Sequence, residues 1–249
     1  MVYPILKRTL GVYFGLYLRK ANGIENLPKN GPFIIAANHE SHFDSFLLGT
    51  LVAFNLNKQL FFLTRFKPRR SDKGLFSKVT LFMVRPLFIN LFGCVPVLKK
   101  GGAVDACKSA LRKRKIIGIY PEGKRNQSKT LLAPRTGVAA MALLSKAPVI
   151  PAGIVGSYKI FPIGAFLPRF KRAVINVGKP MRFDRYYNKT PNRKTLEKVT
   201  HQIMVEIGKL CGKRCPRRPF HFSKKPMNKA RRCLRKLRTL SRFRKKRKS

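Results

Sequence analysis

His39 and Asp44 are the residues of this sequence best suited to acid–base chemistry. They follow the apolar run 33–37, which is typical of a short buried strand, and Asp44 opens an apolar run that predicts a helix. Five positions correspond to about 140° around a regular helix, so one helix face cannot hold both side chains. If His39 lies on the strand-to-helix turn and Asp44 in the first helical turn, the carboxylate can reach back to the imidazole. A carboxylate that fixes the tautomer of a histidine makes it a general base near neutral pH.

These residues could also have a structural or a metal-binding role. Ser41 and Asp44 fit an N-cap followed three residues later by an acid, a capping-box-like start to a helix. A metal site could use His39, His42 and Asp44 as two histidines and one carboxylate. The segment is one residue short of the zinc-protease pattern HExxH, however, and the two remaining histidines lie in no ligand-like cluster. The sequence therefore favours the interpretation without a metal.

The charge balance points to a polyanionic partner. The 249 residues include 55 Lys and Arg against 9 Asp and Glu, a formal net charge of +46. A surface of this kind suits nucleic acid or an anionic membrane. The length and the 44% of hydrophobic residues predict one folded domain with a tail. Acidic residues are so rare that each is informative, and three of the nine fall in the two stretches that could do chemistry: Glu40, Asp44 and Glu122.

Cysteine usage and hydropathy bear on the compartment. Five scattered cysteines, an odd number, predict reduced thiols in a protein facing the cytosol. The apolar run 9–18 is too short to span a membrane, since about 20 residues are needed, and run 79–97 is interrupted by Arg85 and two prolines. Residues 1–20 predict a short aromatic-rich helix with basic ends that lies in a membrane interface. An ordinary docking helix is the alternative.

Strands and helices alternate along the chain. The pattern predicts strands at 33–37, 59–64, 94–98, 116–120, 149–155 and 173–177. It predicts helices from 44 to about 54 and at 76–91, 103–113, 137–145 and 191–210. This order indicates an α/β fold with a mixed, largely parallel sheet flanked by helices. Functional sites of such sheets gather at the carboxyl ends of the strands, where His39 falls.

A second motif follows the strand expected at 116–120. Gly123 permits a tight turn, and Lys124 and Arg125 place two cations at the carboxyl end of the strand. Arginine binds phosphate through a planar fork, whereas lysine acts as a point charge. Glu122 could orient Arg125 or bind a substrate hydroxyl. In a chain this basic, a solvated turn is the plain alternative, but the retained acid and the shared sheet edge favour a binding site.

With both motifs, the chain resembles the glycerolipid acyltransferases of the 1-acylglycerol-3-phosphate (lysophosphatidic acid) acyltransferase family. Four blocks in order carry this resemblance over about residues 1–210: Asn38-His39-x4-Asp44, similar to NHx4D; Gly93–Val97, similar to G-x-I-x-V; Tyr120–Asn126, similar to FPEGTRS; and the proline-bearing Val149–Gly156. The resemblance implies acyl transfer from acyl-CoA or acyl carrier protein to the free hydroxyl of lysophosphatidic acid, with no cofactor. His39 would be the base, Asp44 its partner, and Arg125 with its neighbours the phosphate site.

The sequence departs from the family pattern at residues that would contact the acceptor. The family usually has Thr where Lys124 stands, Ser where Asn126 stands, and an Arg shortly after the second block, where this chain has Lys99 and Lys100. Lys99 or Lys100 would then take over phosphate contact without the fork of arginine. Gly123 and the backbone around Pro151 are candidates for closing the pocket or polarising the thioester carbonyl.

Several functional alternatives remain. The acceptor could be another lysolipid or glycerol 3-phosphate, or the chain could bind lipid without catalysis. From another class, a basic nucleic-acid-binding protein would use the charge, but no helix-turn-helix, zinc-finger or RRM-like pattern is present. We expect a membrane-associated protein at the cytoplasmic face, with an acyltransferase domain over 1–212. The tail 213–249, with 18 Lys and Arg and no acid, is expected to be disordered or to lie on an anionic membrane surface.

Overall fold

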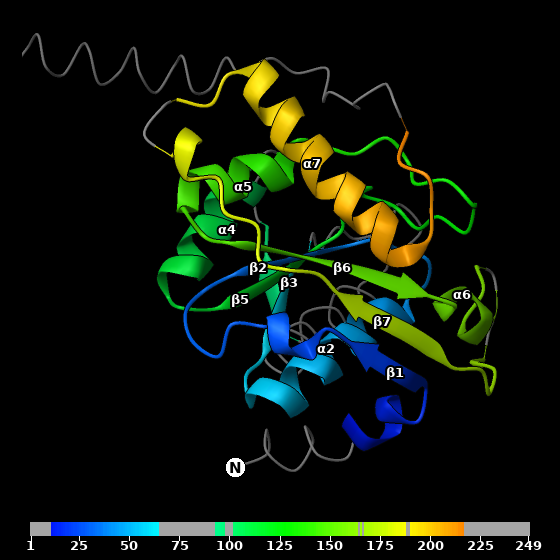
Figure 1. Cartoon of the computed structure of the whole chain (residues 1–249). Coiled ribbons are helices and arrows are strands. Elements are labelled where there is room, and N and C mark those ends of the chain that lie inside the picture. The colour runs from blue at the N-terminus through cyan, green and yellow to red at the C-terminus, as the bar shows by residue number, and fades with distance from the viewer. Residues whose placement is uncertain are drawn as a thin grey trace, which may run out of the picture.

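The protein is built on one seven-stranded sheet with the strand order β1-β7-β6-β2-β5-β3-β4 (Figure 1). The computed structural model describes residues 11–64, 93–97, 102–163, 165, 167–187 and 190–216. The strands are β1 (Leu18–Asn22), β2 (Ile34–Ala37), β3 (Leu60–Thr64), β4 (Cys94–Pro96), β5 (Ile116–Ile119), β6 (Val149–Val155) and β7 (Ala173–Val177). All neighbouring pairs run parallel except β6 and β7, which are antiparallel. The predicted mixed, largely parallel sheet is confirmed.

Helices cover both faces of the sheet. In Figure 1, α4 (Ala103–Arg112), α5 (Gly137–Ser145) and α7 (Arg193–Cys211) lie on one face, and α2 (Phe43–Leu56) lies on the other. A one-turn helix, α6 (Ser157–Ile160), follows β6, and two 3-10 turns, Ile24–Asn26 and Asp184–Tyr186, complete the described elements. The sheet is thus the middle of three layers.

Alternation along β2 shows how the two cores form. Ile34 and Ala36 pack into the cluster under α4, α5 and α7, whereas Ile35 and Ala37 pack into the cluster under α2. All four residues of β2 are buried. A strand covered on both faces reads as a continuous apolar run, which is why the sequence signals this central strand so clearly.

The antiparallel β7 brings further segments to the edge of the sheet where β2 ends. Val155, at the carboxyl end of β6, pairs with Val174 at the start of β7, and Leu18 at the start of β1 pairs with Ala173. Because β6 runs parallel to β2, the amino ends of β1 and β7 lie at the edge where β2 ends. The segments before these two strands therefore border the turn that carries His39.

Two sequence predictions need correction or lie beyond the described part. Residues 11–15 are helical, but the helix predicted over 1–20 is wrong at its end, because Leu18–Asn22 form β1 and pair with β7. Hydrogen bonding to β7 outweighed the local helical pattern there. The predicted helix 76–91, residues 1–10, and the tail beyond 216 lie outside the described residues. The other predicted strands and helices of the described chain are present with small shifts at their ends.

Candidate active site

His39 and Asp44 meet where β2 turns into α2. The imidazole Nδ1 lies 2.7 Å from Asp44 Oδ2, and the side chains are 18% and 0% exposed, respectively. The apolar residues of β2 fix the start of the turn, and Asp44 lies in the first turn of α2. The spacing that excludes a shared helix face therefore becomes a contact across the turn.

A single oxygen of Asp44 serves both the histidine and the helix start. Asp44 Oδ2 also accepts hydrogen bonds from the backbone N–H groups of Glu40 (2.7 Å) and Ser41 (2.9 Å). Backbone amides only donate, so this oxygen acts as an acceptor, and His39 Nδ1 carries the hydrogen. That tautomer leaves Nε2 as the nitrogen able to accept a proton. The predicted N-cap is wrong, because His42 and not Ser41 precedes the helix, but Asp44 still bonds the backbone of the turn and the imidazole through one oxygen.

The aromatic ring of Tyr120 supports the imidazole. The His39 and Tyr120 rings stack with centroids 4.0 Å apart at 10°. The Tyr120 hydroxyl lies 3.0 Å from Ser45 Oγ, on the first turn of α2. Burial, with the Asp44 charge adding to it, raises the pKa of Tyr120 well above its ordinary value, so the hydroxyl stays protonated. Tyr120 therefore fixes the ring plane of His39 without carrying charge.

Asn38 anchors the turn to the sheet. Its side-chain amide donates to the carbonyl of Ile154 (2.8 Å) and accepts from the N–H of Ile154 (2.7 Å). Asn38 is buried, and Ile154 lies in β6. This two-way pairing extends the β2–β6 ladder by a side chain and holds the residue before His39.

Glu122 and Asn126 join the second motif to the His39 turn. Glu122 Oε1 accepts from the N–H of His39 (3.2 Å), and Oε2 accepts from Asn126 Nδ2 (2.9 Å) and from the N–H of Leu132 (2.8 Å). The N–H of Asn126 in turn donates to the His39 carbonyl at 2.6 Å. The buried carboxylate of Glu122 thus holds two loops together, where the sequence indicated contact with Arg125 or with a substrate hydroxyl.

The turn at Gly123 requires glycine. Its φ is +69°, and a Cβ there would lie 2.9 Å from Arg135 Nε. A side chain would therefore meet both backbone strain and a close contact. The N–H of Gly123 donates to the Tyr120 carbonyl at 3.0 Å. This bond closes the turn and engages the Gly123 amide that was a candidate for polarising the thioester.

The cations of the second motif differ in exposure. Lys124 is exposed and Arg125 is half-buried. Burial and the nearby positive charge of Arg125 lower the pKa of His42, the second histidine of the first motif, with a smaller contribution from His39. Arg125 therefore lies close enough to His42 to act on it electrostatically, at the same edge as His39. The lowered pKa of His42 favours its neutral form, so its ring adds no positive charge to that of Arg125 near neutral pH.

The remaining candidates lie apart or outside the described residues. Pro151 is buried within β6 opposite Ala36, and its carbonyl accepts from the N–H of Gly178 at 2.8 Å. Because proline has no N–H, a donor to the thioester in this region would have to come from another backbone amide. Lys99 and Lys100 lie outside the described residues.

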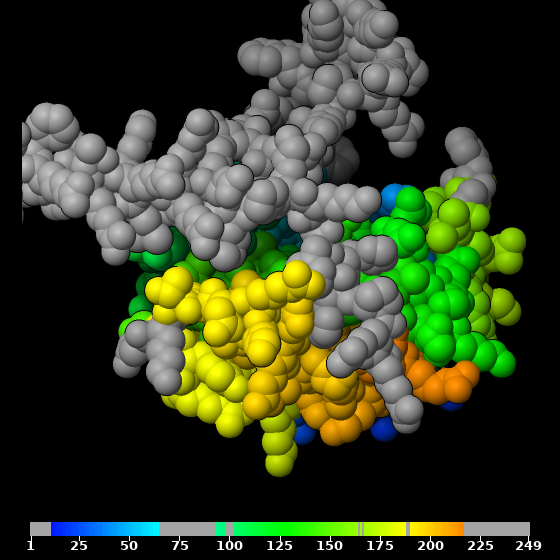
Figure 2. All heavy atoms as spheres, turned by 90° about the horizontal axis from the view of Figure 1, so that it is seen from above, coloured from blue at the N-terminus to red at the C-terminus, as the bar shows by residue number. Residues whose placement is uncertain are grey.

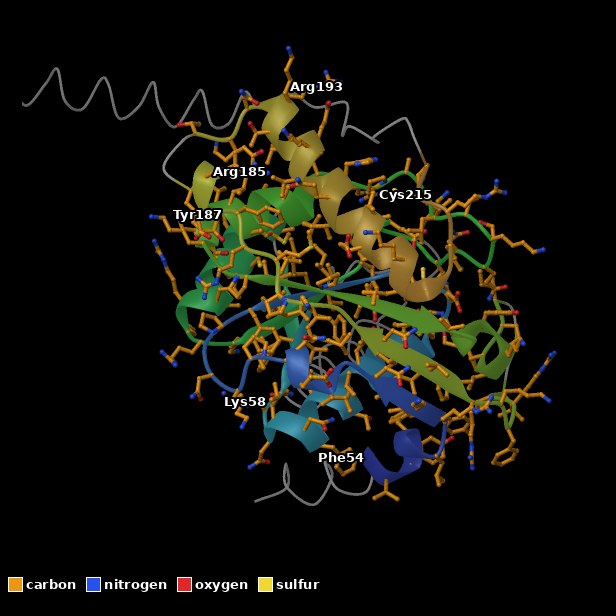
Figure 3. The ribbon with its side chains drawn as sticks, viewed as in Figure 1. Phe54, Lys58, Arg185, Tyr187, Arg193 and Cys215 are labelled. Carbon is orange, nitrogen blue, oxygen red and sulfur yellow. The ribbon has the colours of Figure 1, made fainter. Side chains whose placement is uncertain are left out.

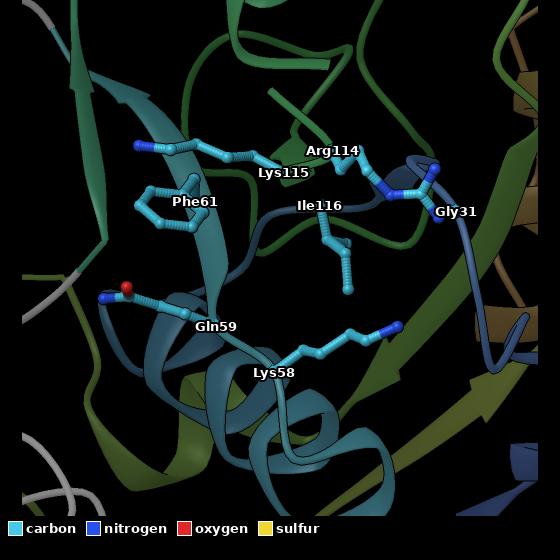
Figure 4. A pocket seen from close by; sticks show the side chains of 7 residues that line it. All are labelled: Gly31, Lys58, Gln59, Phe61, Arg114, Lys115 and Ile116. Carbon is cyan, nitrogen blue, oxygen red and sulfur yellow. The ribbon is translucent and has the colours of Figure 1, made fainter. Parts of the chain in front are cut away.

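Two further observations concern metal ligands and a hollow in the described chain. No group of three His, Cys, Asp or Glu side chains there is placed to hold a metal ion. A hollow of about 270 Å³ opens at the amino ends of β3 and β5, lined by Gly31, Lys58, Gln59, Phe61, Arg114, Lys115 and Ile116 (Figure 4). It lies at the opposite edge of the parallel strands from His39, so we do not assign it to the candidate active site.

Sequence reasoning missed three supports of the site. The sequence marks Tyr120 as the end of a strand and the first residue of a family block, and Asn126 as a departure from that block, but it assigns neither a contact with His39. Lys213 falls in the predicted tail, yet its Nζ lies 2.7 Å from Glu40 Oε1. The available signal was the scarcity of acids, because a retained Glu40 beside His39 implies a buried cationic partner.

Comparisons with known proteins indicate the family of the chain. The family model described as Acyltransferase matches residues 19–155. A 1-acyl-sn-glycerol-3-phosphate acyltransferase of Bacillus subtilis is 24% identical over 189 residues, which cover 75% of this chain and 84% of that protein. A chloroplastic 1-acyl-sn-glycerol-3-phosphate acyltransferase of Arabidopsis thaliana is 26% identical over 161 residues, covering 61% of this chain and 40% of the relative.

A longer relative and a solved structure are also similar to this chain. An uncharacterised protein of Mycobacterium bovis is 26% identical over 177 residues, 64% of this chain. The chain spans only 43% of that relative's length. The crystal structure of the 1-acyl-sn-glycerophosphate acyltransferase of Thermotoga maritima has a similar fold, with a TM-score of 0.59, 20% identity, and coverage of 84% of this chain and 78% of that one.

The matched residues 19–155 run from β1 to the end of β6 and include His39, Asp44 and the Glu122–Arg125 turn. This span is more than half of the 249 residues. The protein belongs to the acyltransferase family.

Proposed function

We propose that this protein transfers a fatty acyl group from an acyl thioester to the free hydroxyl of lysophosphatidic acid, giving phosphatidic acid. The observation that carries the proposal is the 2.7 Å contact between His39 Nδ1 and Asp44 Oδ2, at the same edge of the sheet as the half-buried Arg125. A general base beside a phosphate-matching cation suits an acceptor that bears both a hydroxyl and a phosphate. The relatives of Bacillus and Arabidopsis named for this activity support the choice of acceptor.

The proposed reaction is a direct transfer. His39 Nε2 takes the proton of the acceptor hydroxyl as its oxygen attacks the thioester carbonyl. The carbon–sulfur bond then breaks, and the imidazolium returns the proton to the departing thiolate. Asp44, held as an acceptor by two backbone amides, stabilises the imidazolium meanwhile. Every proton is accounted for, and no cofactor is needed besides the acyl-CoA or acyl carrier protein that supplies the acyl group.

The state of nearby nucleophiles supports direct transfer over a covalent acyl-enzyme. Burial raises the pKa of Cys107 to about 12 and that of Cys211 to about 11, so both remain thiols near neutral pH. Ser41 Oγ donates to the Phe161 carbonyl at 2.9 Å, and Ser45 Oγ is paired with Tyr120. None of these groups is hydrogen-bonded to the imidazole that would activate it.

Arg125 is the proposed phosphate ligand, with Lys124 as an exposed second cation. Its guanidinium fork matches two phosphate oxygens, and holding the phosphate would place the acceptor hydroxyl near His39. Gly123 lets the two side chains leave the turn at this edge. We keep Lys99 and Lys100 as further phosphate-binding proposals, since they follow β4.

We further propose that the catalytic edge faces an anionic membrane at the cytoplasmic face, where lysophospholipid acceptors reside. Large apolar side chains are exposed before β1 and before β7, and we call this set the apolar edge: Val12, Tyr13, Leu16, Ile163, Leu167 and Phe170. The two halves meet where the Tyr17 and Phe170 rings stack, with centroids 6.3 Å apart. Phe170 is 95% exposed and is flanked by Arg169 and Lys171. Apolar side chains beside cations are suited to an anionic lipid surface.

The apolar edge reaches the candidate active site through ring contacts. The loop that carries Phe170 begins at Phe161, whose ring stacks on Phe43 with centroids 5.7 Å apart. Phe54, which is labelled in Figure 3, extends the exposed apolar surface along α2, because its ring lies against Gly11. In the described chain, no helix is both long enough and apolar enough to span a membrane.

The decisive experiment gives the purified full chain each thioester donor with a panel of acceptors. The donors are acyl-CoA and acyl carrier protein, and the acceptors are lysophosphatidic acid, glycerol 3-phosphate and a lysophospholipid without a terminal phosphomonoester. Product is identified by mass. We expect phosphatidic acid as the main product, and a matched His39→Ala sample shows the uncatalysed background. Equal turnover of the acceptor without the phosphomonoester would remove Arg125 as a selector, and no acylated product from any pair would overturn the proposal.

A further inference from the structure

A buried carboxylate beside His39 takes no part in the proposed reaction. Glu40 is 2% exposed and lies between His39 and Ser41 in the turn. Its Oε1 is 2.7 Å from Lys213 Nζ, and Ser157 Oγ donates to its Oε2 at 3.5 Å. The backbone N–H of Tyr158 also stabilises the carboxylate. Glu40 is thus enclosed, with Lys213 as its counter-charge.

Lys213 reaches Glu40 because α7 ends in a left-handed turn. Gly212 has φ +69° and its N–H bonds to the carbonyl of Gly208, as does the N–H of Lys213 (3.0 Å). This glycine-terminated helix end reverses the chain and directs it back over the sheet. The Lys213 side chain is only 11% exposed. A lysine is seldom so enclosed unless its charge is paired.

The same short segment also holds the loop of the second motif. Lys213 Nζ donates to the Asn126 carbonyl at 3.4 Å, and the Arg214 carbonyl accepts from the N–H of Leu131 at 2.9 Å. In Figure 2 the orange end of the described chain lies against the green segment that includes these loop residues. Asn126 itself donates to the His39 carbonyl. Lys213 therefore contacts the turn that carries His39 through Glu40, and the 126–131 loop through the Asn126 carbonyl.

We propose that Lys213 is a positioning residue for acyl transfer, which pairs with the buried Glu40 and so holds the His39 turn against the 126–131 loop. This inference rests on the proposed function for its kinetic consequences only. In the described chain, Lys213 forms no hydrogen bond or ion pair with His39, Lys124 or Arg125, and it acts through Glu40 and Asn126. The Glu40–Lys213 pair thus stabilises the His39 turn at Glu40, as Glu122 stabilises it at the N–H of His39.

The pair has a pH signature. Burial raises the pKa of Glu40, Asp44 adds to the rise, and Lys213 and the Tyr158 N–H oppose it. If Lys213 is removed, the pKa of Glu40 in the folded protein rises further. A raised carboxyl pKa means that folding stability is greatest while the group is protonated and is lost as pH rises through the folded pKa. The Lys213→Met protein should therefore resemble the wild type in acid and fall behind it as pH rises.

The test compares three full-length variants. Lys213→Met removes the charge and keeps the length of the stem. Glu40→Gln combined with Lys213→Met removes both charges, so that no uncompensated carboxylate remains. Lys209→Met is the control. Lys209 lies in the last turn of α7 and pairs with Glu206 at 2.7 Å, but at an exposed position. We expect Lys213→Met to lower kcat on the order of tenfold or more near pH 8, with KM for either substrate little changed, because misplacement of a catalytic group by a fraction of an ångström is costly.

Two outcomes of the kinetics separate positioning from plain structural support. The kcat ratio of Lys213→Met to wild type should rise toward one as the pH is lowered from about 8 to about 5, because acid favours the protonated form of Glu40. The double variant should recover much of the loss and show a ratio that does not depend on pH. The inference would be overturned if Lys213→Met had the same kcat ratio to wild type as Lys209→Met. It would also be overturned if the kcat of the double variant were no higher than that of Lys213→Met.

A measurement that needs no acyl transfer distinguishes failure of this inference from failure of the proposed function. Hydrogen–deuterium exchange of the 38–42 and 126–131 backbone is followed at both pH values, with thermal melting beside it. We expect faster exchange in both loops and a lower Tm for Lys213→Met near pH 8, with recovery in acid and in the double variant. If the wild type transfers no acyl group, the proposed function fails while this pattern still decides the role of Lys213. Unchanged exchange in both loops would overturn that role even in an active enzyme.

Discussion

The imidazole of His39 lies flat on the phenol ring of Tyr120, with the two centroids 4.0 Å apart and the planes at 10°. Tyr120 ends the β5 strand region, and its other neighbour is Phe62, whose ring stacks at 5.7 Å. The three rings thus form one stack across the neighbouring strands β2, β5 and β3, with His39 just after β2, Tyr120 just after β5 and Phe62 in β3. The orientation of His39 therefore depends on the packing of the sheet as well as on Asp44.

We predict that the Tyr120 ring matters more than its hydroxyl. Tyr120→Phe keeps the stack and loses the bond to Ser45, a loss of about 1 kcal/mol of stability. Its kcat should stay within a few-fold of wild type. Tyr120→Leu removes the flat support, and kcat should fall on the order of tenfold or more. Steady-state kinetics with thermal melting checks this, and equal kcat values for the two variants would show that stacking does not orient His39.

His39→Ala and Asp44→Asn should each abolish most acyl transfer. Loss of the base is worth about 10²–10⁴ in rate. In Asp44→Asn the amide oxygen can take the place of Oδ2 and still accept from the two backbone amides and from His39 Nδ1, but it carries no negative charge to stabilise the imidazolium.

The Asn variant is also the better structural control. Asp44→Ala would leave two buried N–H groups unpaired, at about 1–3 kcal/mol each, and confuse stability with catalysis. His201→Ala, at an exposed position of α7, is the matched histidine control. Circular dichroism shows whether each variant is folded. More than about a tenth of wild-type turnover in a folded His39→Ala or Asp44→Asn protein would remove these residues from the proposed mechanism.

Arg125→Ala should raise KM for the phosphorylated acceptor far more than KM for the thioester donor, because only the guanidinium fork matches two phosphate oxygens. Arg125→Lys keeps the charge, so its KM for the phosphorylated acceptor should lie between those of the wild type and of Arg125→Ala. The charge of Arg125 also helps to lower the pKa of His42, so removing it should raise that pKa toward the ordinary value while Arg125→Lys should not. Titration of His42 by NMR measures this. Equal effects on both KM values would move Arg125 out of the acceptor site.

The sequence predicted the strands that are buried on both faces and the pair at their end. The apolar runs of β2, β5 and β6 are local signals, and the spacing of His39 and Asp44 allows a contact only across a turn. Strand β1 could not be predicted in this way, because Leu18–Asn22 has no strand pattern and is set by pairing with β7, about 150 residues away. The same holds for the partners of Glu40 and Glu122. Both acids stand out as rare in the sequence, but burial decided which cation or amide each one met.

The apolar edge should contribute to membrane binding through burial of side chains in lipid. Leu167→Ser combined with Phe170→Ser should weaken binding to vesicles on the order of tenfold or more, since burying one such side chain is worth about 1.5–3 kcal/mol. Leu144→Ser, an exposed leucine of α5, is the matched control. Co-sedimentation at low and high salt measures this. If the double variant binds like Leu144→Ser, the loop before β7 does not face lipid.

Truncation tests where the domain ends. The sequence predicts that the domain ends at residue 212, but Lys213 and Arg214 bond to Glu40, Asn126 and Leu131. A protein ending after Pro216 keeps these bonds and loses 16 basic residues of the tail. We expect it to transfer acyl groups to detergent-dispersed acceptor at a rate close to that of the full chain. Its binding to anionic vesicles should be weaker at low salt, because each basic residue near such a surface contributes about 1 kcal/mol that salt screens.

A protein ending after Gly212 differs from it by four residues and should behave otherwise. It leaves Glu40 buried without its cation and frees the 126–131 loop, so activity in detergent should fall on the order of tenfold or more near pH 8. Adding Glu40→Gln to this shorter protein should restore part of the loss, because no uncompensated carboxylate then remains. Co-sedimentation with anionic vesicles measures membrane binding, and the detergent assay measures acyl transfer. Equal detergent activity of the two truncated proteins would return residues 213–216 to the tail, and unchanged vesicle binding by the longer one would leave membrane attachment to the apolar edge and the segment before it.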